Sequence, residues 1–246
     1  MFFPVRTFIS FLAITASFVT NAAISLQQTR VVFDGDKKTA SLFVVNQNTN
    51  TPYLAQGWIE DEQNNRVQGP LLILPPIQRI EPGENSQIKI QALPAARLLR
   101  QDRETLFYLN LREIPPKNEN GNTLQVALQN RIKVFYRPVG LKNTELASPW
   151  QSQLVLNKRD NRWQITNPSA YYITLVDAQA RQRGPSVAGF TPLMLAPGAS
   201  DMLPGDANSY GSAPVLTYLN DYGGRPEITF RCGLERCKVI TNQVPR

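Results

Sequence analysis

Apolar and polar residues alternate along residues 124–138. Six apolar side chains follow this period: Leu124, Val126, Leu128, Ile132, Val134 and Tyr136. A period of two predicts a β-strand, and Pro138 ends it because proline lacks the N–H that a strand ladder needs. At ~3.3 Å per residue the run would extend roughly 50 Å, whereas an ordinary strand has about 5–6 residues. A β-sandwich of usual size therefore covers only part of this apolar row.

Two interpretations of the long strand are open at this point. In the first, the whole segment is a core strand with a bulge at Asn130, where the alternation breaks. In the second, Leu124, Val126 and Leu128 form an edge that is kept open for the sheet of another chain. Periodicity alone does not separate the two.

The rest of the first half has the short strands and regular turn signals of an immunoglobulin-like β-sandwich. Its other strands are predicted at residues 24–33, 38–46, 53–60, 71–80, 87–91 and 105–114. Trp58 is expected in the core, and a helical turn is expected around residues 95–100. Pro75 and Pro76 allow only an edge or kinked strand, and the sequence there is compatible with a cis bond.

A second sandwich is predicted after a break in composition at residues 138–148. Its strands are expected at residues 153–157, 163–167, 171–177, 193–196, 215–220, 228–232 and 237–241. The prediction is an all-β protein with two immunoglobulin-like β-sandwich domains, at residues 23–141 and 142–246.

Residues 1–22 have the pattern of a secretory signal peptide. Arg6 supplies the positive charge, residues 8–19 form a mostly apolar core, and residues 20–22 fit a small-x-small cleavage site. The alternative, a membrane anchor, needs about 20 apolar residues, more than this core offers. The mature protein is therefore expected to begin at Ala23 and to be soluble outside the cytoplasm, without membrane insertion.

The charge and the composition argue against several function classes. The formal net charge is +7, but the cations are scattered singly through strands and turns, which disfavours nucleic-acid binding. The chain has no histidine, which removes histidine-based catalytic triads and the common zinc sites. Ser86 and Lys89 match a hydrolase S-x-x-K motif formally, yet they lie in a predicted strand rather than a helix. We expect no enzyme activity, no cofactor and no metal.

The only two cysteines, Cys232 and Cys237, are separated by four residues. In an exported protein this spacing favours a disulfide, here one that pins a hairpin. Because the closed loop is short, the chain-entropy model predicts a stabilisation of only ~2 kcal/mol.

Several stretches of the chain closely resemble the PapD-like periplasmic pilus chaperones. The matching segments are residues 29–30, 53–56, 75–76, 81–83, 101–108, 111–116, 124–138 and 220–226. The resemblance implies a periplasmic, non-enzymatic chaperone with its two domains joined at an angle. Such a chaperone binds, folds and caps pilin subunits by donor-strand complementation and delivers them to an outer-membrane usher. Only nine residues, 115–123, separate Ile114 from Leu124, which resembles the short-loop class that serves rod-like pili.

The resemblance also implies roles for single residues. Arg30 and Lys133 match the cleft pair that grips the C-terminal carboxylate of the pilin subunit, although two cations on solvated strand faces remain the alternative. Leu124, Val126 and Leu128 match the apolar row that fills the groove of the subunit.

Further residues match the family at the domain junction and on the surface. Glu104, Arg137 and Asp221 match an ionic cluster that holds the two domains at a fixed angle. A subunit- or usher-facing surface is expected at Tyr53, Leu54, Pro75, Pro76 and Ile114. Asn130 departs from the small hydroxyl residue expected at its position, and we expect it to affect subunit preference.

The expected partners are pilin subunits and an usher, and the free protein is expected to cap itself as a dimer. Two rival classes are a structural or adhesive fibre component and a secreted hydrolase. A fibre component would need a free N-terminal donor extension, and residues 23–28 are too short for one.

Overall fold

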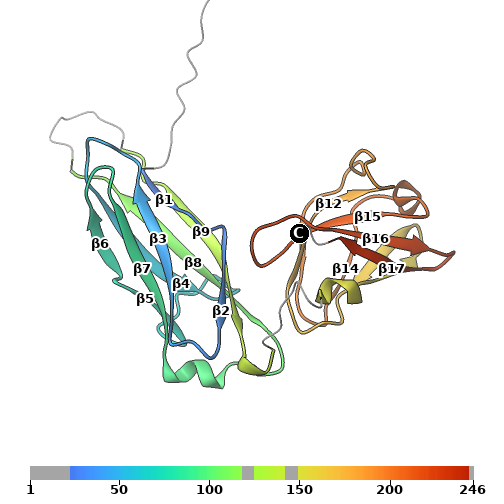
Figure 1. Ribbon diagram of the computed structural model, residues 1–246, viewed down its shortest axis with the longest axis horizontal. Helices are drawn as coiled ribbons and strands as arrows, with labels where there is room; N and C mark the ends of the chain where they lie inside the picture. Colours follow the sequence, from blue (N-terminus) through green and yellow to red (C-terminus); the bar gives the residue numbers. More distant parts are fainter. Residues whose placement is uncertain (1–22, 118–124, 142–148, 244–246) are drawn as a thin grey trace, which may run out of the picture.

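The computed structural model describes residues 23–117, 125–141 and 149–243. These residues form two β-structured lobes that meet at an angle (Figure 1), with three-residue to five-residue 3-10 turns as their only helical elements. The all-β prediction is confirmed. The predicted domain boundary, between residues 141 and 142, falls at the edge of a segment outside the described residues and stays a prediction.

The first lobe packs two sheets face to face. One sheet has the order β1 (Ile24–Leu26), β3 (Thr39–Asn46), β7 (Asn85–Ala92) and β5 (Leu71–Leu74). The other has the order β2 (Arg30–Asp34), β9 (Gln129–Arg137), β8 (Thr105–Ile114), β4 (Tyr53–Glu60) and β6 (Ile77–Ile80). Between them lies a core in which Phe33, Leu42, Leu109 and Val134 are fully buried.

Two predicted strands of this lobe are each divided between the two sheets. Residues 24–33 form β1 in one sheet and β2 in the other, and residues 71–80 form β5 and β6. The second change of sheet occurs at a cis bond between Leu74 and Pro75. The helical turn is found at Pro94–Leu98, as predicted.

Two expectations for this lobe are wrong. Trp58 is not in the core, because Ala55 and Ile59 take the inward positions of β4 and Trp58 faces outward. Its indole N–H donates to Glu60 at 2.7 Å, and the guanidinium of Arg66 lies 4.4 Å from its ring. Nor does the ladder between β8 and β9 contain a bulge, because Asn130 pairs in regular register with Leu111.

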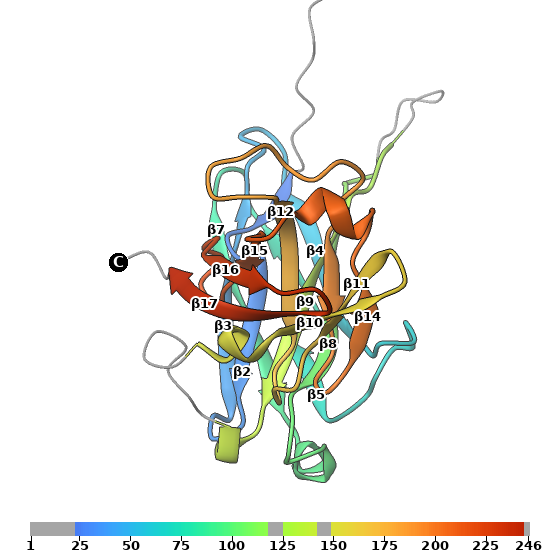
Figure 2. The ribbon, with the colours of Figure 1, turned by 90° about the vertical axis from the view of Figure 1, so that its right-hand side faces the viewer.

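The second lobe is built from eight strands in one continuous hydrogen-bonded order (Figure 2). That order is β13 (Leu193–Leu195), β12 (Ile173–Gln179), β15 (Val215–Leu219), β16 (Glu227–Cys232), β17 (Arg236–Gln243), β10 (Val155–Arg159), β11 (Arg162–Thr166) and β14 (Ser200–Met202). The strand β14 was not predicted from the sequence. The core of this lobe is separate from the first and includes Trp163, Tyr210, Tyr218 and Phe230.

Candidate functional site

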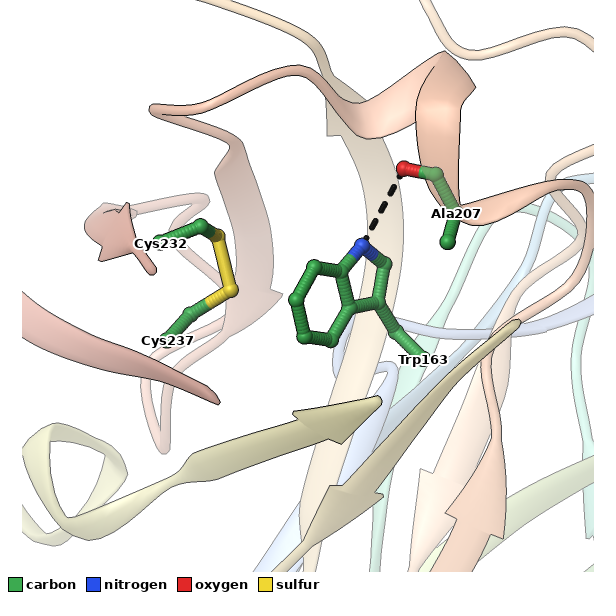
Figure 3. The surroundings of a disulfide bond; sticks show 4 residues. All are labelled: Trp163, Ala207, Cys232 and Cys237. Atoms are coloured by element: carbon green, nitrogen blue, oxygen red, sulfur yellow. Dashed lines mark hydrogen bonds between the residues drawn. A yellow bond between two sulfur atoms is a disulfide. The ribbon is translucent and has the colours of Figure 1, made fainter. Parts of the chain in front are cut away.

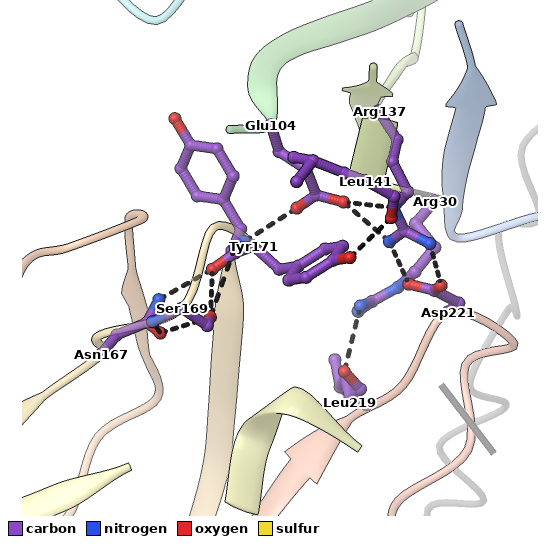
Figure 4. A network of polar contacts seen from close by, with 10 residues as sticks. Arg30, Glu104, Arg137, Leu141, Asn167, Ser169, Tyr171, Leu219 and Asp221 are labelled. Carbon is purple, nitrogen blue, oxygen red and sulfur yellow. Dashed lines mark hydrogen bonds and ion pairs between the residues drawn. The ribbon is translucent and has the colours of Figure 1, made fainter. Parts of the chain in front are cut away.

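Strands β2 and β9 run parallel, and their register places Arg30 directly beside Lys133. Neighbouring positions fix the face: Val31 and Val134, one residue further along each strand, are in the core of the first lobe. Because side chains alternate across a strand, Arg30 and Lys133 both lie on the outer face of the sheet. The two cations, 103 residues apart in the sequence, therefore stand together on one face of the sheet. Arg30 points from this face towards Leu219 of the second lobe (Figure 4).

Both cations are half-buried, which makes their charges costly without an anion nearby. Burial lowers the pKa of Lys133, and the positive charges of Arg30 and Arg131 lower it further. Arg30 donates to the backbone oxygen of Leu219 in the second lobe at 3.5 Å. Within the described residues, no carboxylate lies in ion-pair distance of Lys133. Such a pair favours a carboxylate ligand through charge-assisted hydrogen bonds.

Glu104, Arg137 and Asp221 form one ionic cluster between the lobes (Figure 4). Arg137 donates to Glu104 at 2.8 Å within the first lobe. It also forms two hydrogen bonds to Asp221 of the second lobe, at 2.7 and 3.1 Å. Arg137 and Glu104 are nearly fully buried.

The protonation of this cluster follows from its burial. Burial raises the pKa of Glu104 to about 7, and Asp221 adds to that rise, although Arg137 and the backbone amide of Tyr172 oppose it. Burial also disfavours a charged Arg137, but its contacts with Asp221 and Glu104 outweigh burial and raise its pKa. Arginine stays charged in proteins. Glu104 therefore titrates near neutral pH.

A second set of contacts between the lobes surrounds Tyr172, and sequence reasoning missed it. The amide of Tyr172 donates to Glu104 at 2.8 Å, and its hydroxyl donates to Glu62 at 2.7 Å. Its ring lies 5.6 Å from that of Phe135, and the Glu104 amide donates to the backbone oxygen of Ala170. No local pattern of residues indicates this role, because the partners lie far apart in the chain.

The predicted apolar row, Leu124, Val126 and Leu128, precedes β9 in the chain. Strand β9 starts at Gln129, so Val126 and Leu128 precede it, and their exposed fractions are 61% and 40%. Leu124 lies outside the described residues. Val126 and Leu128 are an even number of residues before Val134, which is in the core, and before Ile132, which packs against it. The row therefore continues the inward face of the strand past the end of the sandwich.

Three of the five predicted surface residues line one pocket. Tyr53, Leu54 and Ile114 line a shallow pocket together with Arg79 and Pro115. Pro75 and Pro76 are exposed at the junction of β5 and β6 and do not line it.

The cysteines form the predicted disulfide, which joins β16 to β17 beside the turn of their hairpin (Figure 3). The ring of Trp163 lies between the disulfide and Ala207, and its indole N–H donates to the Ala207 oxygen at 3.2 Å. Over the described part of the chain, no three His, Cys, Asp or Glu residues gather as metal ligands. The same part contains no helix with the length and apolarity of a membrane span.

Two family models match the chain. Residues 23–142 match the model for pili and flagellar-assembly chaperones, PapD N-terminal domain, and residues 149–230 match that for the pili assembly chaperone PapD, C-terminal domain. Chaperone protein PapD of Escherichia coli is 45% identical over 220 residues, which are 89% of this chain and 90% of that protein. The probable fimbrial chaperone YfcS of Escherichia coli strain K12 is 41% identical, over 90% of this chain and 88% of its own length.

Solved structures show the same two-lobed fold. The Pseudomonas aeruginosa CupB2 chaperone superimposes with a TM-score of 0.70 at 28% identity, over 85% of this chain and 100% of its own. The SafB chaperone of Salmonella enterica, solved in complex with the pilin SafA, has a TM-score of 0.72 at 24% identity. That alignment covers 87% of this chain and 98% of the other.

Proposed function

Since the chain belongs to the PapD family of periplasmic pilus-assembly chaperones, we propose that it captures pilin subunits through the C-terminal carboxylate and completes their fold with its own strand. The members of this family are chaperones rather than enzymes. The substrate in this proposal is a pilin that lacks the last strand of its sandwich and therefore exposes a hydrophobic groove.

The observation that carries the proposal is the pairing of Arg30 with Lys133 on one sheet face. Two adjacent cations repel one another, and the lowered pKa of Lys133 reflects its burial first and that repulsion second. A subunit carboxylate between them would offset both costs. It would also fix the register in which the C-terminal strand of the subunit pairs with β9.

Donor-strand complementation assigns the apolar row to the subunit groove. Val126 and Leu128 are exposed in the free protein, which is unfavourable for apolar side chains unless a partner covers them. Together with Leu124 they would occupy alternate pockets of that groove, while backbone hydrogen bonds supply affinity.

The cluster of Glu104, Arg137 and Asp221 would hold the lobes at the angle that positions Arg30 beside the cleft. Delivery of the subunit to an outer-membrane usher belongs to the same proposal, with the pocket of Tyr53, Leu54 and Ile114 as part of the surface that faces subunit or usher. Residues 1–22 would be cleaved as the protein enters the periplasm. The free protein would protect its apolar row by forming a self-capping dimer.

Replacement of either anchor cation tests this function. We expect Arg30→Ala and Lys133→Ala to fold normally and to lose capture of the pilin that is encoded in the same gene cluster, measured by co-purification from the periplasm. Lys89→Ala, which removes an exposed cation from β7 in the other sheet, is the matched control and should capture as wild type does. Wild-type yields of subunit with both anchor variants would refute the proposal.

A further inference from the structure

A buried carboxylate stands at the end of the first sandwich, just where the apolar row leaves it. Glu113 is 5% exposed, and it occupies an inward position of β8, in alternation with the core residues Phe107, Leu109 and Leu111. A charged group at a core position costs free energy unless hydrogen bonds compensate it. Its partners therefore indicate what it does.

Both oxygens of this carboxylate accept hydrogen bonds from backbone amides of two different segments. Oε2 accepts from the amide of Ile24 in β1 at 2.9 Å. Oε1 accepts from the amide of Leu128, the residue before β9, at 3.3 Å. The backbone amide of Glu113 in turn donates to the oxygen of Leu128 at 3.0 Å. One residue thus binds the first strand of the opposite sheet to Leu128, the last member of the apolar row.

Asn130 completes the arrangement from the neighbouring strand. Its side-chain amide donates to the backbone oxygen of Ile24 at 3.1 Å. The amide and the carbonyl of Ile24 are therefore both bound by side chains from the other sheet, Glu113 and Asn130. We call these three residues the Ile24 clasp.

The clasp lies where the regular ladder of β8 and β9 stops. Beyond Ile114 the chain continues with Pro115 and Pro116, which have no N–H to donate to a neighbouring strand. Beyond the ladder, the side chain of Gln125 donates to the oxygen of Pro116 at 2.8 Å. Leu128 is thus held both by the backbone bond from the Glu113 amide and by the Glu113 side chain, which takes the place of a backbone acceptor for the Leu128 amide.

We propose that Glu113 is a positioning residue for subunit capture, which fixes through the Ile24 clasp the direction in which residues 125–128 leave the sandwich. This inference rests on the proposed function. A segment held in its binding direction loses less conformational freedom when it enters the subunit groove, so the clasp raises affinity without touching the subunit. Asn130 then acts on capture through Ile24, and not by contacting the subunit.

Glu113→Gln tests this inference. The amide has the same shape, but it has one acceptor oxygen for two backbone donors, and its own N–H₂ faces the second donor. We expect hydrogen exchange of the Leu128 amide to become about tenfold faster or more in the free protein. We expect affinity for the pilin of the same gene cluster to fall by about tenfold, which corresponds to about 1.4 kcal/mol.

Two comparisons separate positioning from a general loss of structure. A synthetic peptide of the last residues of that pilin, with a free carboxylate, uses the cation pair and β9 but has no groove for the apolar row, so Glu113→Gln should bind it as wild type does. Glu84→Gln, a change at an exposed glutamate in the same lobe, should alter neither exchange nor affinity. Asn130→Ala removes only the bond to the Ile24 oxygen and should shift both readouts in the same direction, by less.

The outcomes are distinct from those of the function test. If wild type binds neither pilin nor peptide, the proposed function fails. If a folded Glu113→Gln protein binds pilin and exchanges the Leu128 amide as wild type does, the positioning role is wrong. The same holds if pilin and peptide affinities fall together. Should Glu113→Gln fail to fold, unchanged exchange in Asn130→Ala would still overturn it.

Discussion

In this protein, the role of a side chain depends on which face of its strand it occupies. Arg30 and Lys133 are polar residues at outer positions, where two solvated cations would be unremarkable from sequence alone. What the sequence could not give is their register, because β2 and β9 pair across about a hundred residues of chain. Glu113 was visible as an acid at an apolar position of its strand, and that break in the pattern was the available signal.

The lowered pKa of Lys133 predicts a pH dependence of capture. Its ammonium loses its proton at a lower pH than an ordinary lysine of pKa 10.5, because burial and two neighbouring cations oppose the charge. Pilin affinity should therefore decrease as the pH rises towards 10.5, by about tenfold or more, because hydrogen bonds to charged groups contribute about 1.5–3 kcal/mol. Lys133→Arg keeps its charge and should bind with little change over that range. Identical pH profiles for the two proteins would contradict the role of the ammonium.

At the scale of elements, the pattern of residues 124–138 predicted a longer strand than the structure has. β9 covers nine residues, and the apolar row lies before it. The strand is short because its partner β8 gives way to Pro115 and Pro116, which was readable from the sequence. Trp58 was misplaced because a large aromatic residue suggests a core position, whereas Gly57 and Ala55 alternate with it on the inner face.

The β16–β17 hairpin carries the second element-scale prediction. Cys232 and Cys237 are five positions apart, so their disulfide constrains little of the unfolded chain, and we expect Cys232→Ser with Cys237→Ser to cost about 2 kcal/mol. Thermal melts should show a lower transition for the second lobe and an unchanged one for the first, because the two hydrophobic cores are separate. A double variant in which both lobes are unfolded at room temperature would show that the bond supports more than its hairpin.

At the scale of the whole molecule, the lobes are joined by contacts between residues far apart in sequence. Arg137 and Asp221 are 84 residues apart, and Tyr172 and Glu62 are 110 apart. The resemblance to a known family indicated the first pair, whereas nothing in the local pattern indicated the second. Periodicity reveals the faces of strands, but it does not tell which faces of two domains meet.

The interdomain cluster predicts how stability changes with pH. The pKa of Glu104 is about 7 in the folded protein, above the ordinary 4.5, so the folded state holds this proton more tightly than the unfolded state. Its contribution to the free energy of unfolding is therefore complete below about pH 4.5 and is lost as the pH rises through about 7. Glu104→Gln does not titrate. The stability of wild type relative to this variant should fall between those two pH values, and a constant or rising difference in denaturant unfolding would contradict the assignment.

Capture as proposed requires that the apolar row is a donor to another protein and not part of the core. Val126→Asp distinguishes a donor residue from a core residue directly. An exposed aspartate stays hydrated, so the free protein should melt as wild type does. In a dry subunit groove the same charge costs several kcal/mol, and about 1.4 kcal/mol already lowers affinity tenfold. Ile240→Asp, at an exposed apolar residue of the second lobe, is the control that should keep capture.

The decisive measurement is pilin capture by Val126→Asp, taken together with the thermal melt of the free variant. If the apolar row is a donor, the variant should melt almost as wild type does and lose capture, and the uncaptured pilin should be degraded in the periplasm. A variant that unfolds on its own would make Val126 a core residue, and one that captures pilin as well as wild type would leave the apolar row without a role in binding.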